Sequence, residues 1–252
     1  MNNRRRLIAA NWKMYKTAQE SFTYVQLLKN KILDIDEVDI ILCAPYTSLF
    51  HIGPLFEEEN LQLGAQNMAL QREGAFTGEI SSTMLKTSGS HWVIIGHSER
   101  RNLYQETDET VASKTSLAIA EGLRPIVCIG ESLQQRERGA TVDVLRHQFD
   151  AVFTTLATGT VEKVVIAYEP VWAIGTGLNA DPQQILEAHS TIRGMLTETF
   201  EDEANSVRIL YGGSVNGDNC KELIEVEEVD GFLVGGASLE VEKFEKIIRA
   251  AI

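Results

Sequence analysis

Eight short apolar runs alternate with helical patterns along the chain, and this alternation limits the possible folds more than any other feature. The runs, rich in β-branched and other apolar residues, are Leu7 to Ala10, Asp39 to Ala44, Leu61 to Ala65, Trp92 to Gly96, Pro125 to Ile129, Val164 to Tyr168, Arg208 to Tyr211 and Gly231 to Val234. Several are apolar at successive positions, which predicts strands covered on both faces, as in a parallel sheet.

Amphipathic helices are predicted between these runs. One begins at Asp181, an N-cap followed by Pro182 at the first helical position and by Gln184 in a capping-box arrangement. Another extends from about Thr107 to Glu121 and ends at Gly122, which can adopt the left-handed conformation of a C-terminal cap. Strands therefore alternate with helices, the order expected of βα units.

Eight such units predict an α/β fold with one parallel sheet, formed by residues 1–252 as a single domain. Neither a Pro/Ser-rich linker nor a change in composition divides the chain. Both a doubly wound sheet and a closed (β/α)8 barrel satisfy this order, and eight units in about 250 residues favour the barrel.

Composition and net charge limit the partners and the cellular compartment that we expect for this chain. The chain has 252 residues and a net charge of −13, which opposes binding to a nucleic-acid backbone or to an anionic membrane. Its three cysteines, Cys43, Cys128 and Cys220, are far apart and odd in number, so no disulfide framework is predicted. No signal peptide is recognised, and a cytoplasmic location is expected.

Polar residues follow the predicted strands at the point where each strand ends. They are Asn11 and Lys13 after the first, His97, Ser98 and Glu99 after the fourth, Glu131 after the fifth and Glu169 after the sixth. The carboxyl ends of parallel strands share one edge, where ligands bind, so these side chains are expected to converge. Taken singly, His97 is more often a structural histidine, and Lys13 and Glu169 more often solvated surface groups.

Two glycine pairs follow the last strands. Gly212-Gly213-Ser214 and Gly235-Gly236 are expected to open helices and to present unobstructed backbone N–H groups to a phosphate. Tight turns are the simpler explanation of either pair alone. The segment Pro170 to Gly177 carries apolar residues between Pro and Gly, which favours a lid over the same edge, although a loop packed on the rim is the alternative.

The predicted site contains a carboxylate, an imidazole, an ammonium and a phosphate cradle. His97 has no second His or Cys at ligand spacing, and no dinucleotide-binding or Walker motif is present, so neither a metal nor a nucleotide cofactor is predicted. This set of groups suits proton abstraction beside the carbonyl of a small phosphorylated substrate.

Six motifs, in order along the chain, resemble those of the triosephosphate isomerase family. The segments are Asn11 to Met14, Gly74 to Ser81, Gly96 to Arg101, Cys128 to Glu131, Ala167 to Gly177, and the pair Tyr211 to Val215 and Val234 to Leu239. The resemblance implies a TIM barrel and a cofactor-independent isomerase of glycolysis and gluconeogenesis that interconverts dihydroxyacetone phosphate and D-glyceraldehyde 3-phosphate through an enediolate.

The resemblance also implies a role for each matching residue. Glu169 would be the catalytic base, His97 a neutral proton donor beside the helix start at Ser98 and Glu99, and Lys13 with Asn11 the stabiliser of the oxyanion. The phosphate would bind backbone N–H groups of Gly175, Ser214, Gly235 and Gly236. Glu131 and Tyr211 would contact the lid in its open and closed positions, with Leu178 at a hinge.

The family forms homodimers, and the long connection from Gln66 to Glu79 matches the segment that reaches into the partner subunit. Tyr15 departs from the family pattern at this interface. Two alternatives stay open: another sugar-phosphate barrel enzyme, such as an epimerase or aldolase, and a non-enzymatic barrel used for binding or as a scaffold.

Overall fold

Eight parallel strands close into a barrel in the order β1 to β8. The computed structural model describes residues 4–56, 60–157, 159–174 and 179–252. The strands are β1 (Leu7–Asn11), β2 (Asp39–Ala44), β3 (Leu61–Ala65), β4 (Trp92–Ile95), β5 (Arg124–Ile129), β6 (Val165–Tyr168), β7 (Arg208–Tyr211) and β8 (Gly231–Val234). Because β1 pairs with both β2 and β8, the sheet has no edge, and the predicted (β/α)8 barrel is confirmed over the doubly wound sheet.

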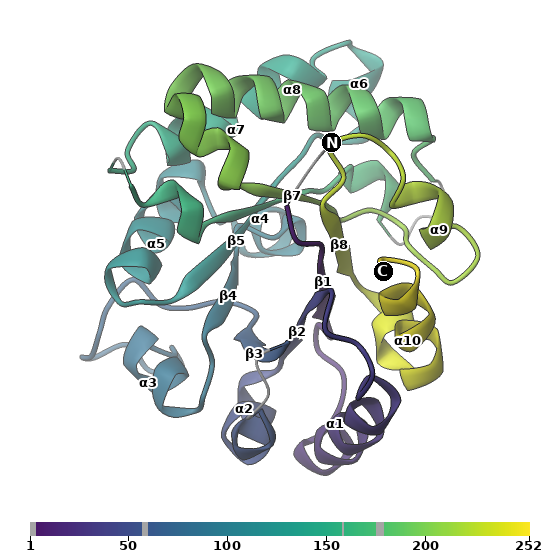
Figure 1. Cartoon of the computed structure of the whole chain (residues 1–252). Helices are drawn as coiled ribbons and strands as arrows, with labels where there is room; N and C mark the ends of the chain where they lie inside the picture. The colour runs from purple at the N-terminus through teal and green to yellow at the C-terminus, as the bar shows by residue number, and fades with distance from the viewer. Residues whose placement is uncertain (1–3, 57–59, 158, 175–178) are drawn as a thin grey trace.

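Helices surround the barrel, and α10 lies beside α1 where the sheet closes (Figure 1). The α-helices are α1 (Ala18–Lys31), α2 (Tyr46–Ile52), α3 (Ser82–Thr87), α4 (Ser98–Tyr104), α5 (Asp108–Ala120), α6 (Leu133–Glu137), α7 (Thr141–Phe153), α8 (Pro182–Phe200), α9 (Cys220–Leu223) and α10 (Val241–Arg249). The short 3-10 turns are η1 (Gly53–Leu55), η2 (Val161–Lys163), η3 (Val171–Ala173), η4 (Glu201–Ser206) and η5 (Gly236–Leu239).

The capping residues start and end the helices as predicted. In α8 the side chain of Asp181 accepts the N–H of Gln184 at 2.8 Å, and the Gln184 side chain accepts the N–H of Asp181 at 3.1 Å. Thr107 caps α5, and Gly122 follows that helix with φ at +79°, a conformation that glycine adopts without steric cost.

The expectation that both glycine pairs open helices is wrong for Gly212-Gly213, and at Gly235-Gly236 it is met by a short 3-10 helix. After Gly212-Gly213 the chain turns about Asn216, whose side-chain oxygen accepts the N–H groups of Asp218 and Asn219, and α9 begins only at Cys220. This local hydrogen bonding competes with helix formation. After Gly235 the chain makes only the four-residue turn η5, because Glu240 is extended and separates η5 from α10.

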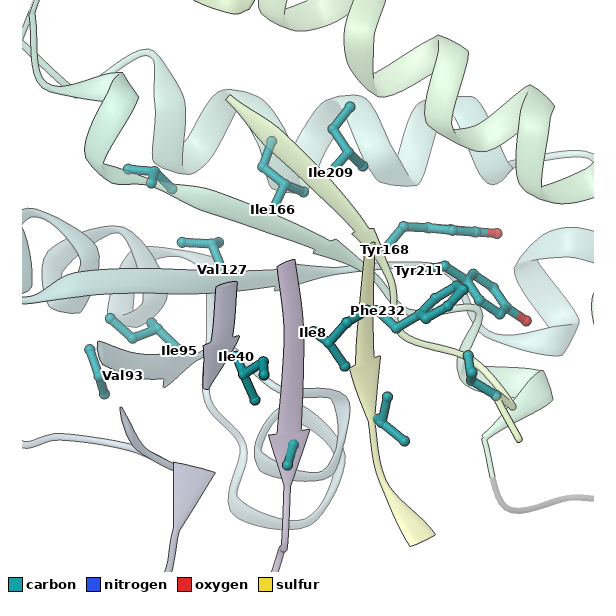
Figure 2. Packing of buried hydrophobic residues seen from close by; sticks show 14 of the residues in the cluster. Ile8, Ile40, Val93, Ile95, Val127, Ile166, Tyr168, Ile209, Tyr211 and Phe232 are labelled. Atoms are coloured by element: carbon teal, nitrogen blue, oxygen red, sulfur yellow. The ribbon is translucent and has the colours of Figure 1, made fainter. Parts of the chain in front are cut away.

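Alternate side chains of each strand enter two separate apolar layers. Ile8, Ile40, Ile166 and Ile209 point outward toward the helices, in the cluster shown in Figure 2. The neighbouring residues fill the inside of the barrel: Leu7, Ala9, Ile41, Cys43, Trp92, Ile94, Ile126, Cys128, Val165, Ala167, Leu210 and Leu233. Side chains in a strand repeat every two residues, so Asn11 and Glu169 continue the inward series at the carboxyl ends of β1 and β6.

His189 is a fully buried histidine of α8 that packs edge-on against Tyr168. Its Nδ1 lies 2.9 Å from the carbonyl oxygen of Glu228, so Nδ1 carries the proton of the neutral ring. Burial lowers the pKa of His189 to about 4, and the Glu228 carbonyl offsets this only in part.

This histidine predicts a loss of stability in mild acid. Between about pH 6.5 and pH 4 the unfolded chain protonates this residue and the folded protein does not, so the free energy of unfolding falls as the pH falls, by about 3 kcal/mol over the whole window. In His189→Asn, whose amide can still donate to Glu228, urea unfolding at pH 6.5 and 5 should show a shallower fall. An unchanged slope would assign the acid sensitivity to other groups.

Two further features concern the cysteines and the helices. All three cysteines are free and buried. Among the residues that the structure describes, no helix is both long enough and apolar enough to cross a lipid bilayer.

Candidate active site

A pocket of about 600 Å³ opens at the carboxyl ends of the strands. Its lining combines most of the residues that the sequence singled out: Asn11, Lys13, His97, Glu169, Gly212, Gly213, Ser214, Gly235 and Gly236. They come from β1, β4, β6, β7 and β8 or from the loops that follow, so the predicted convergence at one end of the barrel is observed.

Glu169 and His97 form a buried pair in this pocket. The Glu169 side chain is 2% exposed, and its two oxygens have different partners. One accepts the backbone N–H of Ser98 at 2.8 Å, and the other lies 3.0 Å from His97 Nε2. His97 is the N-cap of α4, where its Nδ1 accepts the N–H of Glu99 at 3.1 Å. Nδ1 is therefore unprotonated, and the neutral ring carries its proton on Nε2, which faces the carboxylate.

Two glycines leave space for the backbone and side chain of Glu169. A Cβ atom at Gly130 would lie 1.7 Å from the carbonyl oxygen of Glu169, and one at Gly212 would lie 3.0 Å from its Cγ. A larger residue at Gly130 would displace the backbone that carries the carboxylate. These glycines thus serve close packing around Glu169, in addition to any contact with a ligand.

Lys13 is held in an uncommon backbone conformation, with φ at +52°. Its N–H donates to the side-chain oxygen of Asn11 at 3.0 Å, and its carbonyl oxygen accepts from the Gln66 amide at 2.8 Å. Its ammonium lies 2.5 Å from a carboxylate oxygen of Glu99. The side chain also passes close to Gly235, since a Cβ there would lie 3.5 Å from Lys13 Cε.

Glu131 lies behind the pocket and does not line it. Its fully buried carboxylate accepts from the hydroxyl of Tyr168 at 3.1 Å, from Nε1 of Trp172 at 2.9 Å and from Arg136 at 3.1 Å. Trp172 stands in the segment predicted as a lid, so Glu131 fastens the first part of that segment. Burial, together with the charge of Glu131, raises the pKa of Tyr168.

Tyr211 is the last residue of β7, and its side chain is buried. Its hydroxyl packs against Gly213, where a Cβ would lie only 2.2 Å away. Burial raises the pKa of Tyr211 to about 12, and backbone groups of Ala180 and Ser214 offset part of this shift.

The remaining lid residues lie outside the described part of the chain. These are residues 175–178, which include the predicted phosphate ligand Gly175 and the hinge residue Leu178. Ile174, the last described residue before this gap, lines the pocket.

The structure also assigns a role to residues for which the sequence had suggested none. Arg101 donates to the carbonyl oxygens of Gly96 at 2.7 Å and Cys128 at 3.2 Å, and so joins the ends of β4 and β5 beside His97. Gln66 donates to Cys43 as well as to Lys13. Arg101 stands within a motif and Gln66 begins the long connection after β3, but contacts with backbone carbonyls leave no pattern in the sequence.

The arrangement is suited to proton transfer. A carboxylate and a neutral imidazole face one pocket, with one ammonium beside them and backbone N–H groups at the far side. Within the described ranges, no cluster of three or more His, Cys, Asp or Glu residues has the geometry to hold a metal ion.

Comparison with known proteins gives one consistent family. The family model described as triosephosphate isomerase matches residues 6–251. Curated relatives of that name include the protein of Endomicrobium trichonymphae, 46% identical over 246 residues and 98% of each chain. That of Carboxydothermus hydrogenoformans is 46% identical over 99% of this chain and 100% of its own. That of Aquifex aeolicus is 44% identical over 97% and 98%.

Proposed function

The chain belongs to the triosephosphate isomerase family, and we propose that Glu169, His97 and Lys13 carry out the reaction of this family in the pocket described above. The protein is an isomerase that interconverts dihydroxyacetone phosphate and D-glyceraldehyde 3-phosphate in glycolysis and gluconeogenesis. The observation that supports these roles is the buried approach of His97 Nε2 to a carboxylate oxygen of Glu169, at 3.0 Å in the pocket.

The proposed reaction moves one proton between neighbouring carbons. Glu169 removes a proton from the carbon beside the carbonyl of dihydroxyacetone phosphate, and the resulting enediolate carries its charge on the former carbonyl oxygen. The N–H of His97 and the ammonium of Lys13 stabilise this oxygen, and Asn11 holds the backbone of Lys13. Glu169 then returns the proton to the adjacent carbon, while His97 moves a proton between the two oxygens.

Two alternatives find less support. A Schiff-base aldolase needs a lysine on a late strand, and neither β6 nor β7 carries one. An epimerase or a non-enzymatic scaffold would not require Lys13, His97 and Glu169 to converge on one pocket.

We propose that the substrate phosphate binds the backbone N–H groups of Ser214, Gly235 and Gly236, together with Gly175 outside the described residues. The first three line the pocket, and a Cβ at Gly236 would meet no atom within 4 Å. A side chain at this position would therefore enter the open space of the pocket.

Gly236→Val is expected to prevent phosphate binding while the barrel still folds, because its branched side chain would occupy the space of the phosphate. Phosphoglycolate inhibition of the coupled isomerase assay measures this effect, and the inhibition constant should rise by at least about 100-fold. If phosphoglycolate inhibited Gly236→Val at the same concentration as the unaltered protein, the phosphate would bind elsewhere.

We also propose that the protein is a homodimer, with the segment 66–79 reaching into the partner. This segment contains neither helix nor strand and exposes Phe76, which is 45% accessible. A second pocket, of about 170 Å³, opens beside Lys13 and His97 and is flanked by the exposed side chains of Met14 and Tyr104. Apolar side chains exposed around such an opening indicate a surface that another chain covers.

Met14→Glu should dissociate this dimer, because it places a charge at a residue that is 94% exposed in the single chain and that the proposed interface would bury. Sedimentation should give the mass of one chain, and kcat/KM should fall by at least about tenfold as Lys13 loses its support. If the unaltered protein were a fully active monomer, the homodimer proposal would be wrong.

Two broader proposals accompany these. Residues 1–252 form one catalytic domain, supported by the pairing of the first strand with the last. The protein is cytoplasmic, supported by three buried free thiols, which suit a reducing compartment.

A further inference from the structure

Two side-chain donors contact the end of η5 that does not line the active-site pocket. The ammonium of Lys16 donates to the carbonyl oxygen of Leu239 at 2.8 Å. The hydroxyl of Tyr24 donates to the carbonyl oxygen of Ser238 at 2.7 Å. Gly235, Gly236 and Ala237, at the other end of this segment, line the pocket. The donors therefore hold one end of a short segment whose other end faces the substrate.

Packing fixes the positions of both donors. Tyr24 is 4% exposed, and its ring packs edge-on against Trp12 with centroids 4.9 Å apart. Lys16 Nζ lies 4.5 Å from the ring centroid of Tyr24 and 5.5 Å from that of Trp12, within the range of cation–π attraction. The backbone of Lys16 has φ at +70°, which is uncommon for a residue with a side chain.

The segment that carries these donors also carries the proposed catalytic lysine. Trp12 directly precedes Lys13, and Lys13 Cε lies close to Gly235, where a Cβ would be 3.5 Å away. The contacts of Lys16 and Tyr24 therefore join the loop after β1 to the turn after β8. The two parts of the pocket that would meet the phosphate keep their spacing through these contacts.

The turn itself is short. Ser238 ties it to its first residue, because the N–H and the hydroxyl of Ser238 donate to the carbonyl oxygen of Gly235 at 2.9 and 2.7 Å. A four-residue 3-10 turn followed by the extended residue Glu240 depends on neighbouring elements for its position.

We propose that Lys16 and Tyr24 are positioning residues that hold the turn Gly235–Leu239 against Lys13 and so set the affinity of the pocket for the phosphate of the substrate. The proposal rests on the phosphate cradle proposed above. Neither residue is among those found to line the pocket in the described structure, so both act through the backbone of the turn and not by touching the substrate.

The variants Lys16→Met and Tyr24→Phe test this proposal. Each keeps the apolar part of the side chain and removes one donor to the turn. The KM for glyceraldehyde 3-phosphate and the inhibition constant of phosphoglycolate should each rise about two- to tenfold, the effect of one lost buried hydrogen bond. The kcat/KM for glyceraldehyde, which has no phosphate, should stay within about twofold. Lys16→Arg should restore phosphate affinity, because arginine keeps both the donors and the cation.

Lys29→Met is the matched control. Lys29, near the other end of α1, donates to the backbone carbonyl of Leu55 at 2.9 Å, so its loss removes a bond of the same kind away from the pocket. This variant should leave both phosphate-dependent constants unchanged. Urea unfolding midpoints of all variants identify any general loss of structure, and the nearly isosteric Tyr24→Phe decides the outcome if Lys16→Met is poorly folded.

The outcomes separate the positioning role from the proposed function. If phosphoglycolate did not inhibit the unaltered protein, the proposed phosphate cradle itself would be wrong. If the unaltered protein is inhibited and both variants bind phosphoglycolate as tightly, the positioning role is wrong. If the variants lost activity equally toward glyceraldehyde 3-phosphate and toward glyceraldehyde, the positioning role would also be wrong, because that result indicates general damage to the site.

Discussion

Glu169→Gln should lower kcat by about 10²- to 10⁴-fold, the contribution of a well-placed general base. The amide keeps the shape of the side chain and can still accept the N–H of Ser98, which now lies 2.8 Å from the carboxylate. It cannot accept the substrate proton, so the loss measures base catalysis rather than packing. Exchange of the substrate proton with deuterated water, followed by NMR, should fall in parallel with the coupled assay.

A second variant of Glu169 tests whether the position of the base matters, and a variant of Glu187 is its control. Glu169→Asp withdraws the carboxylate by one methylene, and a displacement of about 1 Å can itself cost about 100-fold in rate. Glu187→Gln removes a carboxylate from the outer surface of α8 and should leave kcat unchanged. If Glu169→Gln retained more than a tenth of the kcat, another group would have to be the base.

Much of the fold follows from local chemistry. Doubly covered strands produce runs with few polar residues, and all eight predicted runs begin and end within one residue of the observed strands. The cap at Asp181 was predicted correctly because all its groups lie within four residues. The helix expected directly after Gly212 was wrong, because the side chain of Asn216 acts over a few residues that carry no helical pattern. After Gly235 the helix is only the short η5, because Glu240 is extended.

The residues that form the candidate site could be predicted from the sequence, but their geometry could not. Polar residues at strand ends mark one rim in any parallel barrel, which is why Lys13, His97 and Glu169 could be grouped from the sequence. That Glu169 meets the N–H of Ser98, or that Lys16 reaches Leu239, depends on contacts across 71 and 223 positions of the chain. Contacts of this kind arise from barrel closure, and a single sequence does not display them.

Lys13→Met should lower kcat/KM by about 10²- to 10³-fold, with a large part of the loss in KM. The ammonium lines the pocket with Glu169 and His97 and pairs with Glu99, and the chain carries a net charge of −13. Without it, the carboxylate of Glu99 would lose its cation beside the incoming phosphate dianion, and the developing oxyanion would lose a charged partner. Coupled assays across substrate concentration, with phosphoglycolate inhibition, separate the two losses.

Lys86→Met is the matched control for this substitution, because Lys86 also pairs with a carboxylate, that of Glu121 at 3.2 Å, and lies on the outer helix α3. It changes the net charge of the protein by the same single unit. If both variants lost activity equally, the overall field of the protein would explain the effect. If Lys13→Met kept kcat/KM within about threefold, Lys13 would stabilise neither the phosphate nor the oxyanion. A loss confined to Lys13→Met would show that an acidic protein binds its anionic substrate through one ammonium, which Glu99, Asn11 and Gln66 hold in position.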